Sequence, residues 1–125
     1  MTQIKKLALE DLPACPVETT LTLIGSKWEV LIIRDLLAHD SMRFGELQRS
    51  VGKVSQKVLT SQLRQMEAAG LVSRTVYPEV PPRVEYALTD LGRSLRPIID
   101  AMWDWGEGYK RALGSEEIGT VAAGA

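Results

Sequence analysis

The chain has 125 residues, of which 45% are hydrophobic, and its net charge at pH 7 is −1. This length and apolar content support one domain with a modest core, which we expect over residues 1–113. A single histidine and a single cysteine are too few to build a zinc site from these ligands. Gly45 and Gly52 are spaced too widely for a phosphate-binding loop, so neither an enzyme nor a bound cofactor or metal is expected.

The N-terminal segment superficially resembles a lipoprotein signal, because two lysines precede a leucine-rich stretch and a cysteine follows it. Glu10 and Asp11 interrupt the apolar stretch just before the supposed cleavage site, which excludes that interpretation. The apolar run over residues 30–37 is likewise broken by Arg34 and Asp35, so it cannot span a bilayer. We therefore expect a soluble, cytoplasmic protein with no membrane partner.

Two helices are expected in the first third of the chain. A short helix over residues 16–25 is followed by a helix over residues 28–38 that is apolar almost all round. A helix of that kind must be buried beneath other elements. His39, beside Asp40, stands at the end of the second helix, where a solvated imidazole complements the helix dipole.

Residues 45–88 are the most informative part of the chain, because their pattern predicts a short helix, a tight turn, a second helix and a two-stranded ribbon. Phe44, Leu47 and Val51 are spaced three and four residues apart, so they share the buried face of the first helix. Gly52 then ends this helix. The order of these elements is that of a helix-turn-helix with a wing.

The second helix is expected over residues 55–69. Ser55 is a good N-cap, and Gly70 suits the left-handed position just past a helix end. The buried face of this helix is aliphatic, whereas its start carries hydroxyl, amide and cationic groups that suit base edges and phosphates. These candidate DNA contacts are Ser55, Gln56, Lys57, Thr60, Ser61 and Arg64.

The period of the sequence changes after the second helix. Residues 71–77 and 83–88 are rich in valine, tyrosine and threonine with rough alternation, which predicts two strands. The proline-rich connection over residues 78–82 forbids helix and stiffens the hairpin. A stiff tip ending in Arg83 loses little entropy when an arginine enters a narrow minor groove, so Arg83 is a candidate DNA contact.

Basic residues are concentrated in the same region. Between positions 41 and 83 there are seven basic and three acidic residues, a local charge of +4, which leaves −5 for the rest of the chain. Such a cluster can be no more than a solvated face. Because it coincides with the second helix and the ribbon, we interpret it as an electrostatic footprint for nucleic acid and add Arg43 and Lys53 to the candidate contacts.

The C-terminal part predicts a long helix over residues 90–113 with Thr89 as its cap. Its apolar residues cover more of the helix than a small monomer can hide: Leu91, Leu95, Ile98, Ile99, Met102, Trp103 and Trp105. Aromatic residues are enriched at subunit interfaces, so Met102 and the two tryptophans are candidate dimer contacts. The alternative is that the tryptophans pack on their own domain. Residues 114–125 lack any period and are expected to be disordered.

Several segments of the chain match one known family pattern in order and spacing: Cys15-Pro16-Val17-Glu18, Gly25-Ser26-Lys27-Trp28, Arg43-Phe44-Gly45-Glu46-Leu47, Val58-Leu59-Thr60 through Leu63-Arg64, Gly70-Leu71-Val72, Val76-Tyr77-Pro78-Glu79-Val80-Pro81-Pro82-Arg83-Val84-Glu85-Tyr86, and Leu88-Thr89 with Gly92. On these segments the chain resembles the HxlR-type winged helix-turn-helix transcriptional regulators of bacteria and archaea, distant relatives of the MarR regulators. The resemblance covers residues 15–109, and its most specific part is the wing. The resemblance implies a homodimer joined through its terminal helices.

Cys15 is the one residue that could carry redox chemistry. It precedes Pro16, the usual first helical position, so its sulfur should lie at a helix N-terminus that favours the thiolate. The alternative is a small packed residue near the dimer contact. Some members of the resembled family sense quinones, aldehydes or disulfide stress through the matching cysteine, which implies a possible role in redox sensing here.

These features predict a mainly α protein with a small β-wing (α+β), a winged helix-turn-helix with terminal dimerisation helices. We expect a sequence-specific DNA-binding transcriptional regulator, a homodimeric repressor that reads an inverted-repeat operator in double-stranded DNA. Two alternatives stay open. One is a winged-helix interaction module that has lost DNA binding, and the other is a MarR-like sensor of a small molecule or redox effector.

Overall fold

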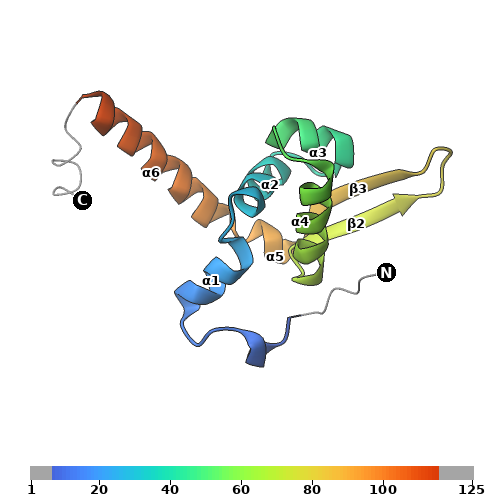
Figure 1. The fold of residues 1–125 in the computed structure, drawn as a ribbon, viewed down its shortest axis with the longest axis horizontal. Coiled ribbons are helices and arrows are strands. Elements are labelled where there is room, and N and C mark those ends of the chain that lie inside the picture. The colour runs from blue at the N-terminus through green and yellow to red at the C-terminus, as the bar shows by residue number, and fades with distance from the viewer. Residues whose placement is uncertain (1–6, 116–125) are drawn as a thin grey trace. The chain divides into compact units, whose positions relative to one another are not determined.

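The computed structural model describes residues 7–115, which form two compact units that divide after Leu95. The first unit combines helices with a small antiparallel sheet, and the second contains one helix, which confirms the predicted fold class (Figure 1). The elements in chain order are a 3-10 turn (Leu9–Asp11), α1 (Pro16–Ile24), α2 (Lys27–Leu37), β1 (Met42–Arg43), α3 (Phe44–Val51), α4 (Gln56–Ala68), β2 (Val72–Tyr77), β3 (Arg83–Leu88), α5 (Asp90–Arg93) and α6 (Arg96–Gly114).

Helix α2 is the centre of the first unit, because it contacts α1, α3, α4 and β3. Its residues Ile32, Ile33 and Leu36 are fully buried, as its apolar sequence predicts. A capping box fixes its start: the Ser26 hydroxyl accepts from the Glu29 N–H, and the Ser26 N–H donates to Glu29 Oε1 at 3.0 Å.

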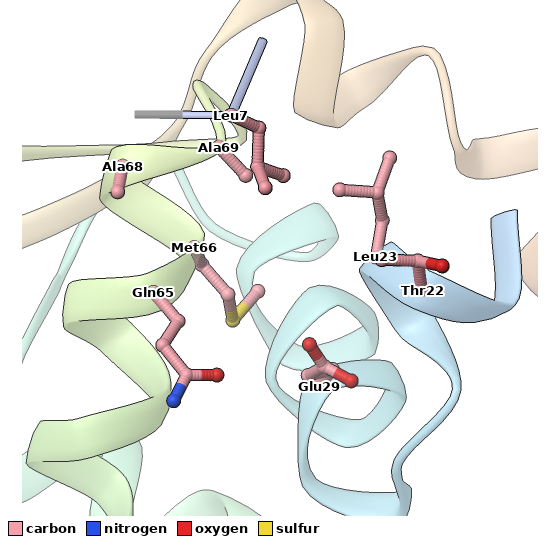
Figure 2. Close-up of a pocket in the computed structure, with 8 residues that line it drawn as sticks. All are labelled: Leu7, Thr22, Leu23, Glu29, Gln65, Met66, Ala68 and Ala69. Atoms are coloured by element: carbon pink, nitrogen blue, oxygen red, sulfur yellow. The ribbon is translucent and has the colours of Figure 1, made fainter. Parts of the chain in front are cut away.

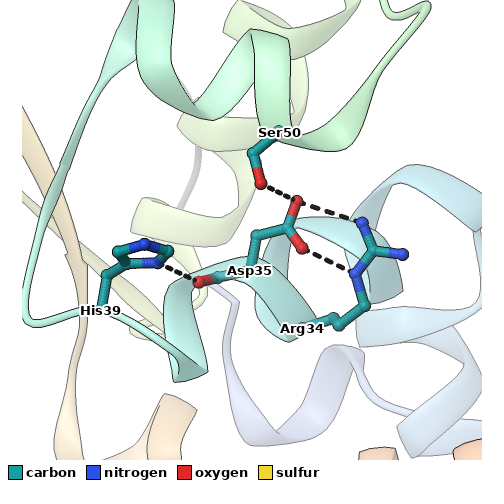
Figure 3. Close-up of polar contacts among 4 residues, drawn as sticks. All are labelled: Arg34, Asp35, His39 and Ser50. Atoms are coloured by element: carbon teal, nitrogen blue, oxygen red, sulfur yellow. Dashed lines mark hydrogen bonds and ion pairs between the residues drawn. The ribbon is translucent and has the colours of Figure 1, made fainter.

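A buried carboxylate joins α2 to α3 (Figure 3). Asp35 accepts from Arg34 Nε at 2.6 Å and Nη2 at 3.1 Å, and the Ser50 hydroxyl donates to it from α3 at 2.8 Å. The hydrogen bond to Asp35 raises the pKa of Arg34, although partial burial opposes that shift. His39 is exposed, with Nδ1 2.9 Å from the Asp35 carbonyl oxygen, which confirms its place at the helix end.

The helix-turn-helix forms as predicted. Gly52 has φ of 80° and ends α3, and Lys53 follows it in the left-handed region with φ of 51°. Ser55 caps α4 by accepting from the Val58 N–H at 3.1 Å. Gly70 has φ of 81° just past the end of α4, a conformation that glycine adopts without steric cost.

The sheet has strand order β1-β3-β2, and both pairings are antiparallel. The β2 and β3 strands form the predicted hairpin, with Tyr77 opposite Arg83 next to the connecting loop. Strand β1 was not predicted, because two residues are too few to show alternation. It forms because Met42 pairs with Tyr86 on β3, a strand that comes much later in the sequence.

The prediction of one uninterrupted helix over residues 90–113 is wrong. Thr89 caps a helix as expected, but α5 ends at Arg93 and a separate helix, α6, follows. Pro97 explains the interruption, because a proline inside a continuous helix has no N–H to donate to the Arg93 carbonyl and its ring would clash with that group. In the first turn of α6, the missing donor costs nothing.

Helix α5 lies very close to the connection between α4 and β2. A Cβ atom built on Gly92 would lie 2.2 Å from the Leu71 carbonyl oxygen, so only glycine fits there. Thr89 reinforces this contact, because its N–H donates to the Leu71 carbonyl at 3.1 Å and its hydroxyl donates to the Gly70 carbonyl at 2.6 Å.

Within residues 7–115, no helix is long and apolar enough to cross a membrane. The tail predicted to be disordered falls largely outside the described residues, since only Gly114, the end of α6, and Ser115 belong to them. The expectation of one domain over residues 1–113 stays a prediction.

Candidate nucleic-acid interface

The outward face of α4 carries most of the candidate DNA contacts. Gln56, Lys57, Ser61 and Arg64 are exposed, and Thr60 is partly buried. The opposite face is apolar, and Leu59, Leu63 and Met66 are buried where the helix contacts α2 and β2. The first unit therefore holds α4 from behind while amide, hydroxyl and cationic groups near its start face solvent.

Ser55, just before α4, and Gln62, within it, differ from the exposed polar residues of this helix. Ser55 is exposed, but its hydroxyl oxygen already accepts the Val58 N–H, so the capping of the helix accounts for this side chain. The Gln62 side-chain oxygen is buried, and the described part of the chain supplies it with no hydrogen-bond partner. An unsatisfied acceptor of this kind lowers stability by about 1–3 kcal/mol.

Further cations surround the start of α3 and the turn that follows it. Arg43, Arg49 and Lys53 are all exposed. The Arg43 N–H donates to Glu46 Oε1 at 2.8 Å, so the backbone of Arg43, and not its guanidinium, makes the contact that fixes the start of α3. Arg43 and Arg83 line the same concave surface, of about 410 Å³, between α3 and the wing loop. The structure thus brings Arg43, from before α3, to the same surface as the wing.

Arg83 is held inside the wing. Its Nη2 lies 3.1 Å from Glu79 Oε2 and its Nε lies 3.3 Å from Glu85 Oε2, and its guanidinium lies 4.0 Å from the centre of the Tyr77 ring. Glu85 also accepts from the Ser41 hydroxyl at 2.8 Å. The positive charge of Arg83 is therefore partly compensated before any DNA is bound.

Sequence reasoning missed these carboxylate partners, although a signal was present. Residues two apart on a strand share one face, so the spacing of Arg83 and Glu85 indicates a contact. Arg49 and Arg74 belong to the basic cluster counted in the sequence but were not named as candidate contacts, and both are exposed. Arg74 lies on β2, opposite Tyr86.

Cys15 is the N-cap residue of α1, as predicted, and it is exposed and not disulfide-bonded. Its thiol caps no backbone N–H, and α1 begins with Pro16 at its first position. Over residues 7–115 no group of histidine, cysteine, aspartate and glutamate side chains is arranged to hold a metal ion.

Helix α6 presents large apolar side chains to solvent. Of the three candidate interface residues, Met102 is 48% exposed, Trp103 63% and Trp105 71%. Ile98, Tyr109 and Leu113 on α6 are also exposed, as is Leu91 on α5. Trp105 stacks on Tyr109 with ring centres 5.4 Å apart, so this aromatic pair is preformed.

Around the helix, these side chains form one stripe and one outlier. At about 100° per residue, Ile98, Met102, Trp105 and Tyr109 fall on one face of α6. Trp103 points roughly 120° away from the centre of that face. The stripe is the continuous apolar surface of the second unit, and Trp103 lies outside it.

Two helices joined by a tight turn and followed by an antiparallel hairpin define a winged helix-turn-helix protein. Residues 23–113 match the family described as HxlR-like helix-turn-helix. The chain is 48% identical over 113 residues to the HTH-type transcriptional regulator YdeP of Bacillus subtilis, an alignment covering 90% of this chain and 88% of the relative. It is 46% identical over 100 residues to an HTH-type transcriptional regulator of Methanothermobacter thermautotrophicus, covering 80% and 76% of the two chains.

Comparison with solved structures leads to the same class of protein. The redox regulator HypR in its reduced form is 44% identical, with a TM-score of 0.75 over 81% of this chain and 99% of that one. The chain belongs to the HxlR-like helix-turn-helix family and is a DNA-binding transcriptional regulator.

Proposed function

We propose that the protein is a cytoplasmic, homodimeric repressor whose α4 helix enters the major groove of an inverted-repeat operator. The observation that carries this proposal is the exposed polar start of α4, held from behind by a buried aliphatic face. Gln56, Lys57, Thr60 and Ser61 are the proposed contacts to base edges or adjacent phosphates. The wing would lie over the flanking minor groove, where Arg83 is the proposed contact.

Dimerisation is proposed through the apolar stripe of α6, because solvent exposure of this many large side chains is costly unless a second surface covers them. Two α4 helices can read an inverted repeat only if the subunits are held about one duplex turn apart. A dimer bound to a promoter represses transcription by excluding other proteins from that DNA. This mechanism needs only a DNA-binding surface and a dimerisation surface.

The first test measures DNA affinity as a function of salt for the cognate operator and for random duplex. We expect Gln56→Ala and Ser61→Ala to weaken operator binding by about 1–3 kcal/mol each and random binding much less, because base contacts supply discrimination. Gln65→Ala, an exposed change near the other end of α4, is the matched control. Equal losses of affinity for operator and random DNA would show that these residues do not read bases. If the protein shows no salt-dependent binding to DNA, the alternative of a protein-interaction module is favoured.

We also propose that the protein responds to a redox effector through Cys15. The exposed thiol at the start of α1 and the similarity to the redox regulator HypR support this proposal. The thiolate, rather than the thiol, is the form that reacts with oxidants and electrophiles. We expect treatment with diamide or a quinone to change operator affinity in the native chain and to have no effect in Cys15→Ser. An equal response in both proteins would exclude the cysteine as the sensor.

A further inference from the structure

The first unit contains a second concave site that is not part of the DNA-facing surface. It lies between α1, α2 and the C-terminal half of α4 and has a volume of about 210 Å³ (Figure 2). Its lining comprises Leu7, Thr22, Leu23, Glu29, Gln65, Met66, Ala68 and Ala69. We propose that this pocket binds a small organic cation, an amine carried on a compact aromatic or aliphatic body.

The charge of the pocket comes from Glu29, which is only 9% exposed. Its Oε1 accepts the Ser26 N–H in the capping box of α2, so the helix start fixes the position of the carboxylate. Among residues 7–115, no basic side chain forms an ion pair with Glu29, and the capping box accounts for its hydrogen bonds. A buried carboxylate without a cation is costly, and a bound ammonium group would compensate it.

The rest of the pocket suits a compact apolar body. Figure 2 shows Met66 and Leu23 facing the same space as the Glu29 carboxylate, from α4 and α1. Ala69 and Leu7 add apolar surface, and none of the lining side chains is basic. The methionine side chain is flexible, so the wall of the pocket that Met66 forms can fit ligands of different shape.

The volume limits the ligand to a small molecule. An apolar cavity of about 150 Å³ holds a benzene molecule, so about 210 Å³ has room for a ring and one short polar substituent. Benzylammonium has this size and places its charge one carbon from the ring. Benzyl alcohol and benzoate have nearly the same size but lack the positive charge, so they separate charge recognition from shape.

The experiment titrates the full chain, labelled with ¹³C at the methionine methyl groups, with benzylamine, benzyl alcohol or benzoate at neutral pH. We expect benzylamine to shift the Met66 methyl resonance saturably and to leave that of Met42, which is buried elsewhere, unchanged. Benzyl alcohol should bind more weakly, and benzoate should not bind.

Two glutamate variants test the charge. Glu29→Gln keeps an acceptor for the capping box and should weaken benzylamine binding by roughly tenfold or more, with benzyl alcohol unaffected. Glu46→Gln is the matched control, because Glu46 accepts the Arg43 N–H in the same way but lies outside the pocket. Leu23→Trp, which fills the space, should abolish binding of both ligands. No saturable Met66 shift, equal affinity for all three probes, or unchanged affinity in Glu29→Gln would each overturn the proposal.

Discussion

Arg83 shows how the meaning of a single residue depends on its neighbours. Its position at the end of a proline-rich loop predicts an arginine presented to DNA, and the structure shows it stacked on Tyr77 and paired with Glu79 and Glu85. The Glu79 carboxylate is half exposed, and surface ion pairs contribute only about 0–1 kcal/mol, so a phosphate can replace Glu79 at small cost. The Tyr77 ring meanwhile offers the guanidinium a cation–π contact that needs neither carboxylate.

Arg83→Ala should therefore weaken operator binding and reduce the slope of log affinity against log salt by about one unit, because one phosphate contact is lost. Glu79→Gln should strengthen binding, since it frees the guanidinium and removes a negative charge beside the DNA. Arg93→Ala serves as the control, because this arginine contacts the His39 carbonyl and lies outside the proposed interface. An unchanged slope in Arg83→Ala would mean that the wing does not contact phosphate.

At the scale of elements, the sequence predicts α3, α4 and the hairpin well because local residues set their ends. Gly52, Ser55 and Gly70 each impose a backbone conformation or a cap that needs no distant partner. Strand β1 could not be predicted in this way, because its pairing depends on Tyr86, more than forty residues away. Pro97 was a readable signal for the break before α6, but the apolar pattern on both sides of it favoured one continuous helix.

The candidate interface also has features that the local sequence predicts and features that it does not. Which residues of α4 face outward follows from helical spacing, because the buried stripe of Leu59, Leu63 and Met66 fixes the opposite face. The carboxylates around Arg83 lie within four residues of it, so their spacing was a signal that sequence reasoning did not use. The pocket at Glu29 could not be predicted in this way, because its lining side chains come together from separate elements.

The backbone conformation of Lys53, in the turn between α3 and α4, can be tested by substitution. Lys53 has a positive φ, which costs a residue with a side chain roughly 1–2 kcal/mol and costs glycine little. Lys53→Gly and Lys53→Ala remove the same charge, so both should weaken DNA binding equally. In urea unfolding, the glycine variant should be the more stable of the two by about 1 kcal/mol. An alanine variant at least as stable would show that the turn adopts another conformation in solution.

At the scale of the whole molecule, the proposed dimer depends on the second unit, whose exposed apolar stripe has no counterpart of equal length among the described helices of the first. Val17 and Leu21 of α1 are also exposed, and they form a shorter apolar face. If the stripe joins two copies, loss of the dimer should abolish operator binding while the first unit stays folded.

Trp105→Ala should weaken dimerisation by more than about tenfold, because truncation of a central interface tryptophan typically costs more than about 2 kcal/mol. Trp103→Ala, the same change outside the stripe, is the matched control and should have a smaller effect. Light scattering across a concentration series measures the assembly, and circular dichroism checks that helix content is kept. A Trp105→Ala protein that stays dimeric at low concentration and binds its operator would place the interface elsewhere, for instance on α1.

The close approach at Gly92 has a mechanical consequence. The Leu71 carbonyl lies against Gly92, and the Thr89 N–H and hydroxyl donate to the carbonyls of Leu71 and Gly70, so α5 packs directly on the backbone that connects α4 to β2. Helix α5 therefore cannot move away from the residues that follow α4 without breaking these two hydrogen bonds. A larger residue at position 92 would push α5 away from the Leu71 carbonyl and so disturb the backbone that leads out of α4, the helix proposed to read the operator.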